Sequence, residues 1–175
     1  MASTFENFNE KELLNFCKKQ LDSVEKVERA YSKKVYFAGP WFTKKGLMLY
    51  NTYKQIYEKC KKNSPYKVFF PKDCIFESTK ETFDSDVKEV YECDIMIAIV
   101  DEKDVGTAWE IGMAHVLGKP IYFLGLDETT FLKRTNLMLA YSGKCITMPK
   151  WHKFLTIGLG HDDFVETNKC WEVIE

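Results

Sequence analysis

The chain has 175 residues, of which 45% are hydrophobic and 29% charged, and its formal net charge is -1. This composition is typical of a soluble globular domain with a full core, and without a basic stripe it argues against binding a nucleic acid polymer. No apolar run approaches the roughly 18 residues that a membrane helix needs, and the polar, acidic N-terminus is unlike a signal or transit peptide. We therefore expect a cytoplasmic protein.

Cysteine and histidine usage bounds the chemistry further. Six cysteines lie far apart without a C-x-x-C pair, which is typical of reduced thiols in the cytosol. The histidines form no metal-ligand pattern, and we expect each to be a surface or packing residue: His115, His152 and His161. The sequence therefore predicts no metal site.

The predicted elements divide the chain into two parts. Residues 1–33 are expected to form a helical extension, because an apolar stripe repeats at helical spacing behind Asn9. Residues 34–175 alternate between predicted strands and predicted helices. The strands are expected at 34–38, 67–70, 95–100, 121–126 and 145–148, and the helices at 47–61, 83–92, 106–117, 135–138 and from 162 or 163 to 173. The connecting loops include a polar flap to about 82 and a loop at 149–160. This alternation predicts a single doubly wound, flavodoxin-like α/β fold: five parallel strands with helices on both faces.

The turn after the first strand carries two aromatic residues. Its sequence, Gly39-Pro40-Trp41-Phe42, matches neither a P-loop nor a G-x-G-x-x-G motif. Aromatic side chains at the mouth of a crevice suit a flat, neutral ring better than a phosphate. Alternatively, Trp41 and Phe42 close the end of the sheet as core residues. Both interpretations stay open at this point.

The central strand and the helix after it contain the most informative carboxylates. The apolar run 95–100 ends in an acidic loop, and a helix begins near Thr107. Thr107 and Glu110 have the T-x-x-E spacing of a capping box, in which Glu110 only bonds the Thr107 amide. Alternatively, Glu110 is a nucleophile that the helix dipole keeps ionised beside a ligand crevice.

Two other carboxylates have expected roles. Asp86 lies three residues after Phe83, at the edge of the inward face of its helix, where a carboxylate is unusual unless it is paired or functional. Asp84 is expected to cap the same helix. Asp94 is expected to accept a hydrogen bond where the central strand begins.

Several motifs occur in a fixed order along the chain. They are Y-F-A-G-P-W-F at 36–42, Asp86, D-I-M at 94–96, D-V-G-T-A-W-E-I-G at 104–112, G-K-P at 118–120 and N-L-M at 136–138. This set resembles the nucleoside 2-deoxyribosyltransferase family, and its most specific part is the combination of D-x-G-T-A-x-E-x-G with a downstream N-L-M. The resemblance covers about Val35 to Met148 and makes 34–175 the catalytic domain.

The resemblance implies specific roles for these residues. Glu110 would be the nucleophile that forms a deoxyribosyl ester, Tyr36 would position it, and Asp86 and Asp104 would hold the base and manage its proton. Asn136, with Met138 beside it, would reach into the site of a neighbouring subunit and bind the sugar hydroxyl. The expected substrate-binding set is Gly39, Trp41, Phe42, Asp73, Gly106, Asn136 and Met138.

The expected activity is transfer of 2-deoxyribose between purine or pyrimidine bases, with deoxynucleosides and free bases as partners. No metal or organic cofactor is expected, and a homo-oligomer, either a dimer or a trimer of dimers, would share its sites. One alternative is a 2'-deoxynucleoside 5'-monophosphate N-glycosidase, which would pass the sugar to water and needs a phosphate site near the first turn. The other is a receiver-like sensing module, which would want acidic residues at the end of its first strand, where this chain has Phe37-Ala38-Gly39.

Overall fold

The computed structural model describes residues 32–100, 102–125, 135–158, 165–166 and 173–174. The predicted N-terminal helix and the proposed caps at Asp162 or Asp163 lie outside these residues. Among the helices that are described, none is long and apolar enough to cross a membrane.

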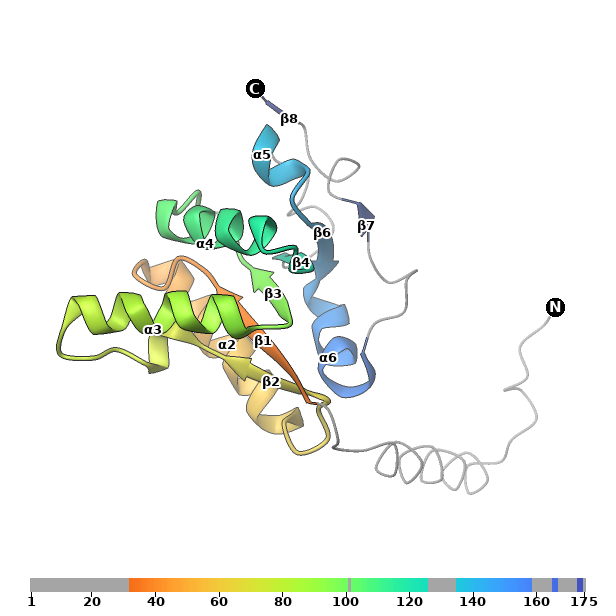
Figure 1. Ribbon diagram of the computed structural model, residues 1–175. Helices are drawn as coiled ribbons and strands as arrows, with labels where there is room; N and C mark the ends of the chain where they lie inside the picture. Colours follow the sequence, from red (N-terminus) through yellow and green to blue (C-terminus); the bar gives the residue numbers. More distant parts are fainter. Residues whose placement is uncertain (1–31, 101, 126–134, 159–164, 167–172, 175) are drawn as a thin grey trace, which may run out of the picture. The chain divides into compact units, whose positions relative to one another are not determined.

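The described part of the chain forms a six-stranded sheet in the order β2-β1-β3-β4-β6-β7 (Figure 1). Five neighbouring strands are parallel, whereas β7 pairs antiparallel with β6. The predicted five-stranded, parallel, flavodoxin-like sheet is therefore confirmed, with β7 added at one edge. The elements are β1 Lys33–Ala38, α2 Lys44–Cys60, β2 Tyr66–Phe69, η1 Pro71–Asp73, α3 Thr79–Glu92, β3 Ile95–Ala98, α4 Val105–Val116, β4 Ile121–Gly125, β5 Thr135–Asn136, α5 Leu137–Ala140, β6 Lys144–Thr147, α6 Met148–Ile157, β7 Val165–Glu166 and β8 Val173–Ile174.

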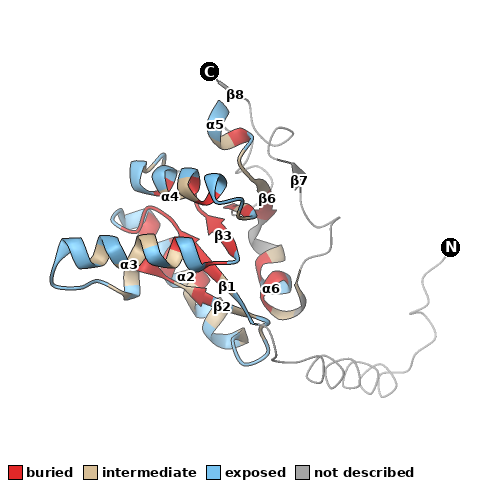
Figure 2. Cartoon of the chain, in the orientation of Figure 1, coloured by how far each residue is buried: buried red, intermediate tan, exposed pale blue. Residues whose placement is uncertain are grey.

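Helices cover both faces of the sheet. In Figure 1, α3 lies in front of the sheet and α2 lies behind it. Alternate residues of β1 belong to two hydrophobic clusters: Val35 and Phe37 pack with α2 and α6, while Tyr36 and Ala38 pack with α3 and α4. All four side chains are fully buried, as the red strands in Figure 2 show. A strand with an apolar pattern on both faces therefore becomes the middle layer of the fold.

Several predicted boundaries are wrong. Helix α3 begins at Thr79 because the Ser78 side chain accepts a hydrogen bond from the Glu81 amide, so Asp84 is not the cap and residues 79–82 are helical rather than a flap. The expected loop at 149–160 contains helix α6, whose Trp151, Phe154 and Leu155 enter the core. The short strands β7 and β8 contradict a final helix to 173.

The strand order defines where a ligand crevice belongs. From β1 the chain passes to β2 on one side and then to β3 on the other, so the order reverses between β1 and β3. In open α/β sheets, ligands bind beyond the carboxyl ends of the strands at such a point. At the opposite end of this pair, Asp94 Oδ2 accepts a hydrogen bond from the Lys34 amide at 2.7 Å, which confirms its predicted role at the strand entry.

Candidate active site

The Tyr36 and Glu110 side chains meet near the reversal point between β1 and β3. The Tyr36 hydroxyl donates a hydrogen bond to Glu110 Oε1 at 2.7 Å. Tyr36 comes from the buried middle strand, and Glu110 comes from helix α4 on the face toward which Tyr36 points. Burial, followed by the charge of Glu110, raises the pKa of Tyr36. The phenol therefore stays protonated and acts as a donor to the carboxylate.

Helix α4 is capped by Asp104. Asp104 Oδ2 accepts hydrogen bonds from the Thr107 amide at 2.7 Å and from the Thr107 hydroxyl at 2.9 Å. The helix consequently begins at Val105, which puts Thr107 in the first turn and Glu110 in the second. The capping-box interpretation of Glu110 is wrong, because Asp104 already occupies the capping position. The Glu110 carboxylate bonds Tyr36 instead.

Glu110 is held in an environment that disfavours its charge. Burial raises its pKa to about 7; the hydrogen bond from Tyr36 opposes this effect, and the charges of Asp86 and Asp104 add to it. The direction of this pKa shift is opposite to the one that the helix dipole would cause. Glu110 lies beyond the first turn, where the dipole acts most strongly, and desolvation outweighs what remains.

Asp86 brings a second carboxylate to the same face of the sheet. It lies on α3, and its charge acts on both Glu110 and Tyr36. Its Oδ1 is buried and has no hydrogen-bond partner among the described residues. Burial, followed by the charge of Glu89, raises the pKa of Asp86 to about 6. A partly buried carboxyl with an unsatisfied oxygen is suited to exchange a proton with a ligand.

The two aromatic residues after β1 have different surroundings. Trp41 is 4% exposed, and its ring stacks on Phe37 at 5.2 Å. A Cβ on Gly39 would lie 2.5 Å from that ring, so only glycine lets the indole fold back over the strand. Trp41 therefore closes the end of the sheet as a core residue. Phe42 is 84% exposed, which leaves its ring accessible to a ligand.

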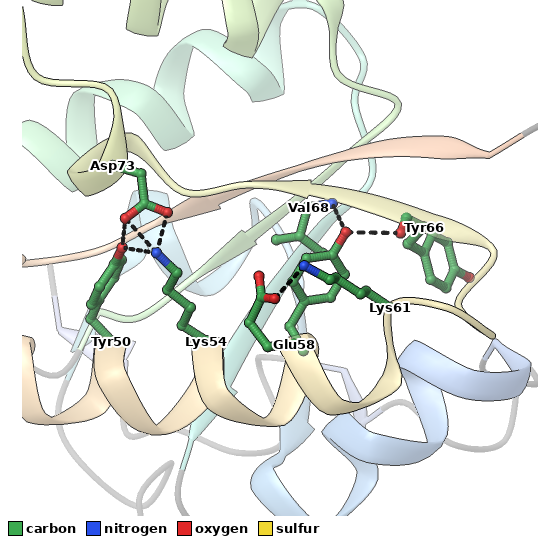
Figure 3. Close-up of polar contacts among 8 residues, drawn as sticks. Tyr50, Lys54, Glu58, Lys61, Tyr66, Val68 and Asp73 are labelled. Atoms are coloured by element: carbon green, nitrogen blue, oxygen red, sulfur yellow. Dashed lines mark hydrogen bonds and ion pairs between the residues drawn. The ribbon is translucent and has the colours of Figure 1, made fainter.

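Asp73 is engaged by helix α2 on the other face of the sheet, as Figure 3 shows. Lys54 Nζ lies 2.6 Å from both of its carboxylate oxygens, and the Tyr50 hydroxyl donates to Oδ1. These residues line an open groove of about 800 Å³ along α2 and η1. Asp73, which was predicted to bind substrate, thus attaches η1 to α2 through these contacts.

The remaining predicted site residues lie in two places. Gly106 is in the first turn of α4, where a Cβ would lie 3.2 Å from Asp104 Oδ2. Asn136 caps α5 by accepting a hydrogen bond from the Met138 amide at 2.8 Å, and the Met138 side chain is 75% exposed. Within the described part of this chain, no hydrogen bond joins Asn136 or Met138 to Glu110. In that same part, no group of His, Cys, Asp and Glu could hold a metal ion.

A family model described as nucleoside 2-deoxyribosyltransferase matches residues 35–164. The chain belongs to this family. The matched residues include Tyr36, Asp86, Asp104 and Glu110. Nucleosides and nucleobases are therefore the class of small molecule on which a member of the nucleoside 2-deoxyribosyltransferase family acts.

Solved structures of deoxyribosyltransferases are similar to this family member. A 2-deoxyribosyltransferase from the psychrotolerant bacterium Bacillus psychrosaccharolyticus is 26% identical with a TM-score of 0.52, over 69% of this chain and 88% of that one. A 2-desoxiribosyltransferase from Leishmania mexicana is 27% identical with a TM-score of 0.45, over 54% of this chain and 65% of that one. A conserved protein from Enterococcus faecalis V583 is 27% identical with a TM-score of 0.44, over 55% and 65%. No curated protein matches the chain.

Two contacts beside the candidate active site were not predicted from the sequence. The Thr43 hydroxyl donates to Glu102, which joins the loop after β1 to the loop before α4. The Phe69 ring stacks on Tyr36 with centroids 5.6 Å apart. Both contacts depend on which strands are neighbours and in which register. The spacing of residues along the chain carries no signal for that.

Proposed function

We propose that this enzyme transfers a 2-deoxyribosyl group between purine and/or pyrimidine bases through a covalent ester with Glu110. The observation that carries the proposal is the 2.7 Å hydrogen bond from the Tyr36 hydroxyl to Glu110 Oε1. It fixes one oxygen of the carboxylate and leaves the other free to attack the sugar. Asp86, whose Oδ1 has no partner among the described residues, is the candidate for holding the base.

In the first half-reaction, ionised Glu110 attacks C1' of the deoxyribose. The bond from C1' to the base nitrogen breaks, and a C1'–O bond to Glu110 forms. The electron pair of the broken bond leaves with the base, which takes a proton from Asp86. Positive charge that builds on the sugar during this step is stabilised by the anionic carboxylate.

In the second half-reaction, a different base attacks C1' from the side that the first base left. The C1'–N bond forms again, Glu110 is released as a carboxylate, and the proton of the incoming nitrogen passes to Asp86. Two inversions give net retention, and the kinetics are ping-pong. Glu110 supplies the nucleophile and Asp86 carries the proton in both steps, so the scheme includes no metal or organic cofactor. The exchange would serve salvage of deoxynucleosides.

The proposal includes a homo-oligomer with shared sites. Asn136 and Met138 match residues that the family uses across a subunit interface. Asn136 and Met138 are exposed on the short segment β5–α5. Large apolar side chains are also exposed on α3 and α4, where Phe83 and Trp109 pack together at 5.7 Å while about half of each remains accessible. Burial of such residues against a second copy is favourable.

A labelling experiment tests the proposed function. The enzyme is given a deoxynucleoside without an acceptor base, and peptides are analysed by mass spectrometry. We expect about one base released per site in a fast phase, as a covalent intermediate requires, and a deoxyribosyl adduct on the peptide that contains Glu110. Glu110→Gln should bind the deoxynucleoside and form no adduct. An adduct on another residue, or an active Glu110→Gln variant, overturns the proposal.

The same experiment separates transfer from hydrolysis. Adding a second free base should produce a new deoxynucleoside faster than free deoxyribose appears. If only 5'-monophosphates react, and free deoxyribose phosphate is the sole sugar product, the enzyme is a hydrolase and the transfer proposal is wrong.

A further inference from the structure

Phe69, the last residue of strand β2, lies against the tyrosine that bonds the candidate nucleophile. Strands β1 and β2 are parallel, and their register makes Phe69 the direct neighbour of Tyr36. Both side chains belong to the cluster under α3 and α4, where Tyr36 is fully buried and Phe69 partly so. Their rings are stacked, with centroids 5.6 Å apart and planes 25° from parallel. The described residues give Tyr36 no other aromatic neighbour.

The stacked geometry constrains the hydroxyl more than the rest of the Tyr36 side chain. The phenol oxygen is at the far end of a rigid ring, so a rotation about the Cα–Cβ or Cβ–Cγ bond displaces the oxygen further than any other ring atom. A flat neighbour on one face of the ring limits both rotations. The hydrogen bond to Glu110 Oε1 at 2.7 Å depends on this orientation, because such bonds weaken when the angle departs from linear.

We propose that Phe69 is a positioning residue, whose ring fixes the Tyr36 phenol and through it the carboxylate of Glu110. Phe69 touches no reacting atom in this scheme; it acts through Tyr36. The inference rests on the proposed role of Glu110, but its test reads the carboxylate directly and requires no turnover. An enzyme that failed to transfer deoxyribose would still answer whether Phe69 controls the Tyr36–Glu110 contact.

The charged and titratable groups around Glu110 define what the test must separate. Tyr36 acts on it from β1, Asp86 from α3, and Asp104 from the start of α4. The Tyr36 hydrogen bond is the contribution that lowers the pKa of Glu110, while burial and the two aspartates raise it. A change confined to the Tyr36 bond therefore moves the titration upward. Lost burial would move it downward.

The experiment is a ¹³C NMR titration of the Glu110 carboxyl in the full chain, with the signal assigned by its absence in Glu110→Gln. Phe69→Leu removes the flat ring, and we expect the midpoint to rise by about 0.3–1 pH unit. Phe69→Tyr keeps the stacked ring and should titrate like the wild type. Phe69→Met, which fills the space without a flat face, is a second variant if Phe69→Leu does not fold.

Phe70→Leu is the matched control. Phe70 is 5% exposed and packs against Phe37 and Tyr50 on the opposite face of the sheet, so its loss costs comparable packing without touching Tyr36. We expect a lower melting temperature and an unchanged Glu110 midpoint. In a Tyr36→Phe background the bond is already absent, so Phe69→Leu should cause no further shift.

The results can overturn the inference in three ways. One is a wild-type midpoint in a folded Phe69→Leu or Phe69→Met variant. Another is the same shift with and without the Tyr36 hydroxyl, which would mean that Phe69 does not act through the Tyr36–Glu110 bond. The third is an upward shift in Phe70→Leu as large as that in Phe69→Leu, which would mean that the shift is not specific to the ring that stacks on Tyr36.

Discussion

At the scale of single residues, the Glu110 carboxylate has to be shielded from water and also ionised. Burial raises its pKa to about 7, so near neutrality only part of the protein carries the ionised form that can attack a sugar. Asp86, with a pKa of about 6, has to be protonated to give a proton to the leaving base. The acid therefore has the lower pKa of the two. The active population combines an ionised Glu110 with a protonated Asp86.

This arrangement predicts a bell-shaped pH profile for kcat/KM. Below about 6 the rate should climb with pH as Glu110 ionises, and above about 7 it should fall because protonated Asp86 disappears. In Asp86→Asn, kcat/KM should be lower, and the fall on the alkaline side should vanish. The rising limb should then level off at the pKa of Glu110 itself, which the loss of the Asp86 charge lowers from about 7. An unchanged profile in a folded Asp86→Asn variant would show that Asp86 is only structural.

The partly buried Glu110 carboxylate also predicts a stability cost that depends on pH. The folded pKa of Glu110, about 7, lies above the unfolded value, so stability is lost as pH rises from about 4 through 7. Glu110→Gln has no charge to bury. Its melting temperature should equal or exceed that of the wild type. Its advantage in unfolding free energy over the wild type should grow from pH 4 to pH 8 and reach about 1–3 kcal/mol. A difference that does not depend on pH would contradict this account.

At the scale of elements, the start of helix α4 joins stability and chemistry in one side chain. Asp104 caps the helix through Thr107, and its negative charge acts on Glu110. The loop before it contains Lys103 at a φ of +52°, a left-handed conformation that is costly for a residue with a Cβ. The geometry of this loop therefore fixes where helix α4 begins and where the Asp104 carboxylate lies.

Two substitutions separate the roles of Asp104. Asn caps helices as well as Asp does, so Asp104→Asn should change the unfolding free energy by only a few tenths of a kcal/mol, whereas Asp104→Ala should lose about 0.5–2 kcal/mol. If Asp104 manages the proton of the base, both variants should lose most activity. The measurement is urea denaturation beside the base-exchange rate. Full activity in Asp104→Asn would reduce Asp104 to a cap.

At the scale of the whole molecule, the sheet order decides which residues can act together. Residues 36, 86 and 110 come from three elements, and only the placement of β1 between β2 and β3, with α3 and α4 on one face, brings them together. Asn136 lies on a separate exposed segment. We propose that Asn136 acts in the same chemistry through a second copy of the chain.

Mixing two inactive variants tests shared sites. Glu110→Gln and Asn136→Ala should each be nearly inactive. In a symmetric dimer with shared sites, half of the randomly mixed dimers combine the two variants and each holds one intact site, so the mixture should recover about a quarter of wild-type activity. Sedimentation at the assay concentration should find an oligomer. No recovery in a mixture that has exchanged subunits would show that each chain completes its own site.

Patterns along the chain were enough to predict much of the fold. Buried apolar runs alternate with amphipathic segments, and this pattern predicted the positions of the five parallel strands. It could do so because a strand covered on both faces must be apolar throughout. The motifs at 36–42, 104–112 and 136–138 indicated the family, which the match over 35–164 bears out. The predictions failed where a local signal had a competitor. Helix α3 is capped by Ser78 and helix α4 by Asp104. The predicted caps, Asp84 and Thr107, are also residue types that cap helices, so the local pattern could not choose between them.

The sequence by itself thus determined the fold class, the family and the set of candidate carboxylates. Only the tertiary structure decided that Glu110 bonds Tyr36 rather than Thr107, that Trp41 is buried while Phe42 is exposed, and that Asp73 is paired with Lys54. The same holds for the direction in which the pKa of Glu110 shifts, which is opposite to the one that the helix dipole would cause. The physical reason is that periodicity and capping are local properties. Desolvation and contact depend on which distant residues the sheet order brings against a side chain.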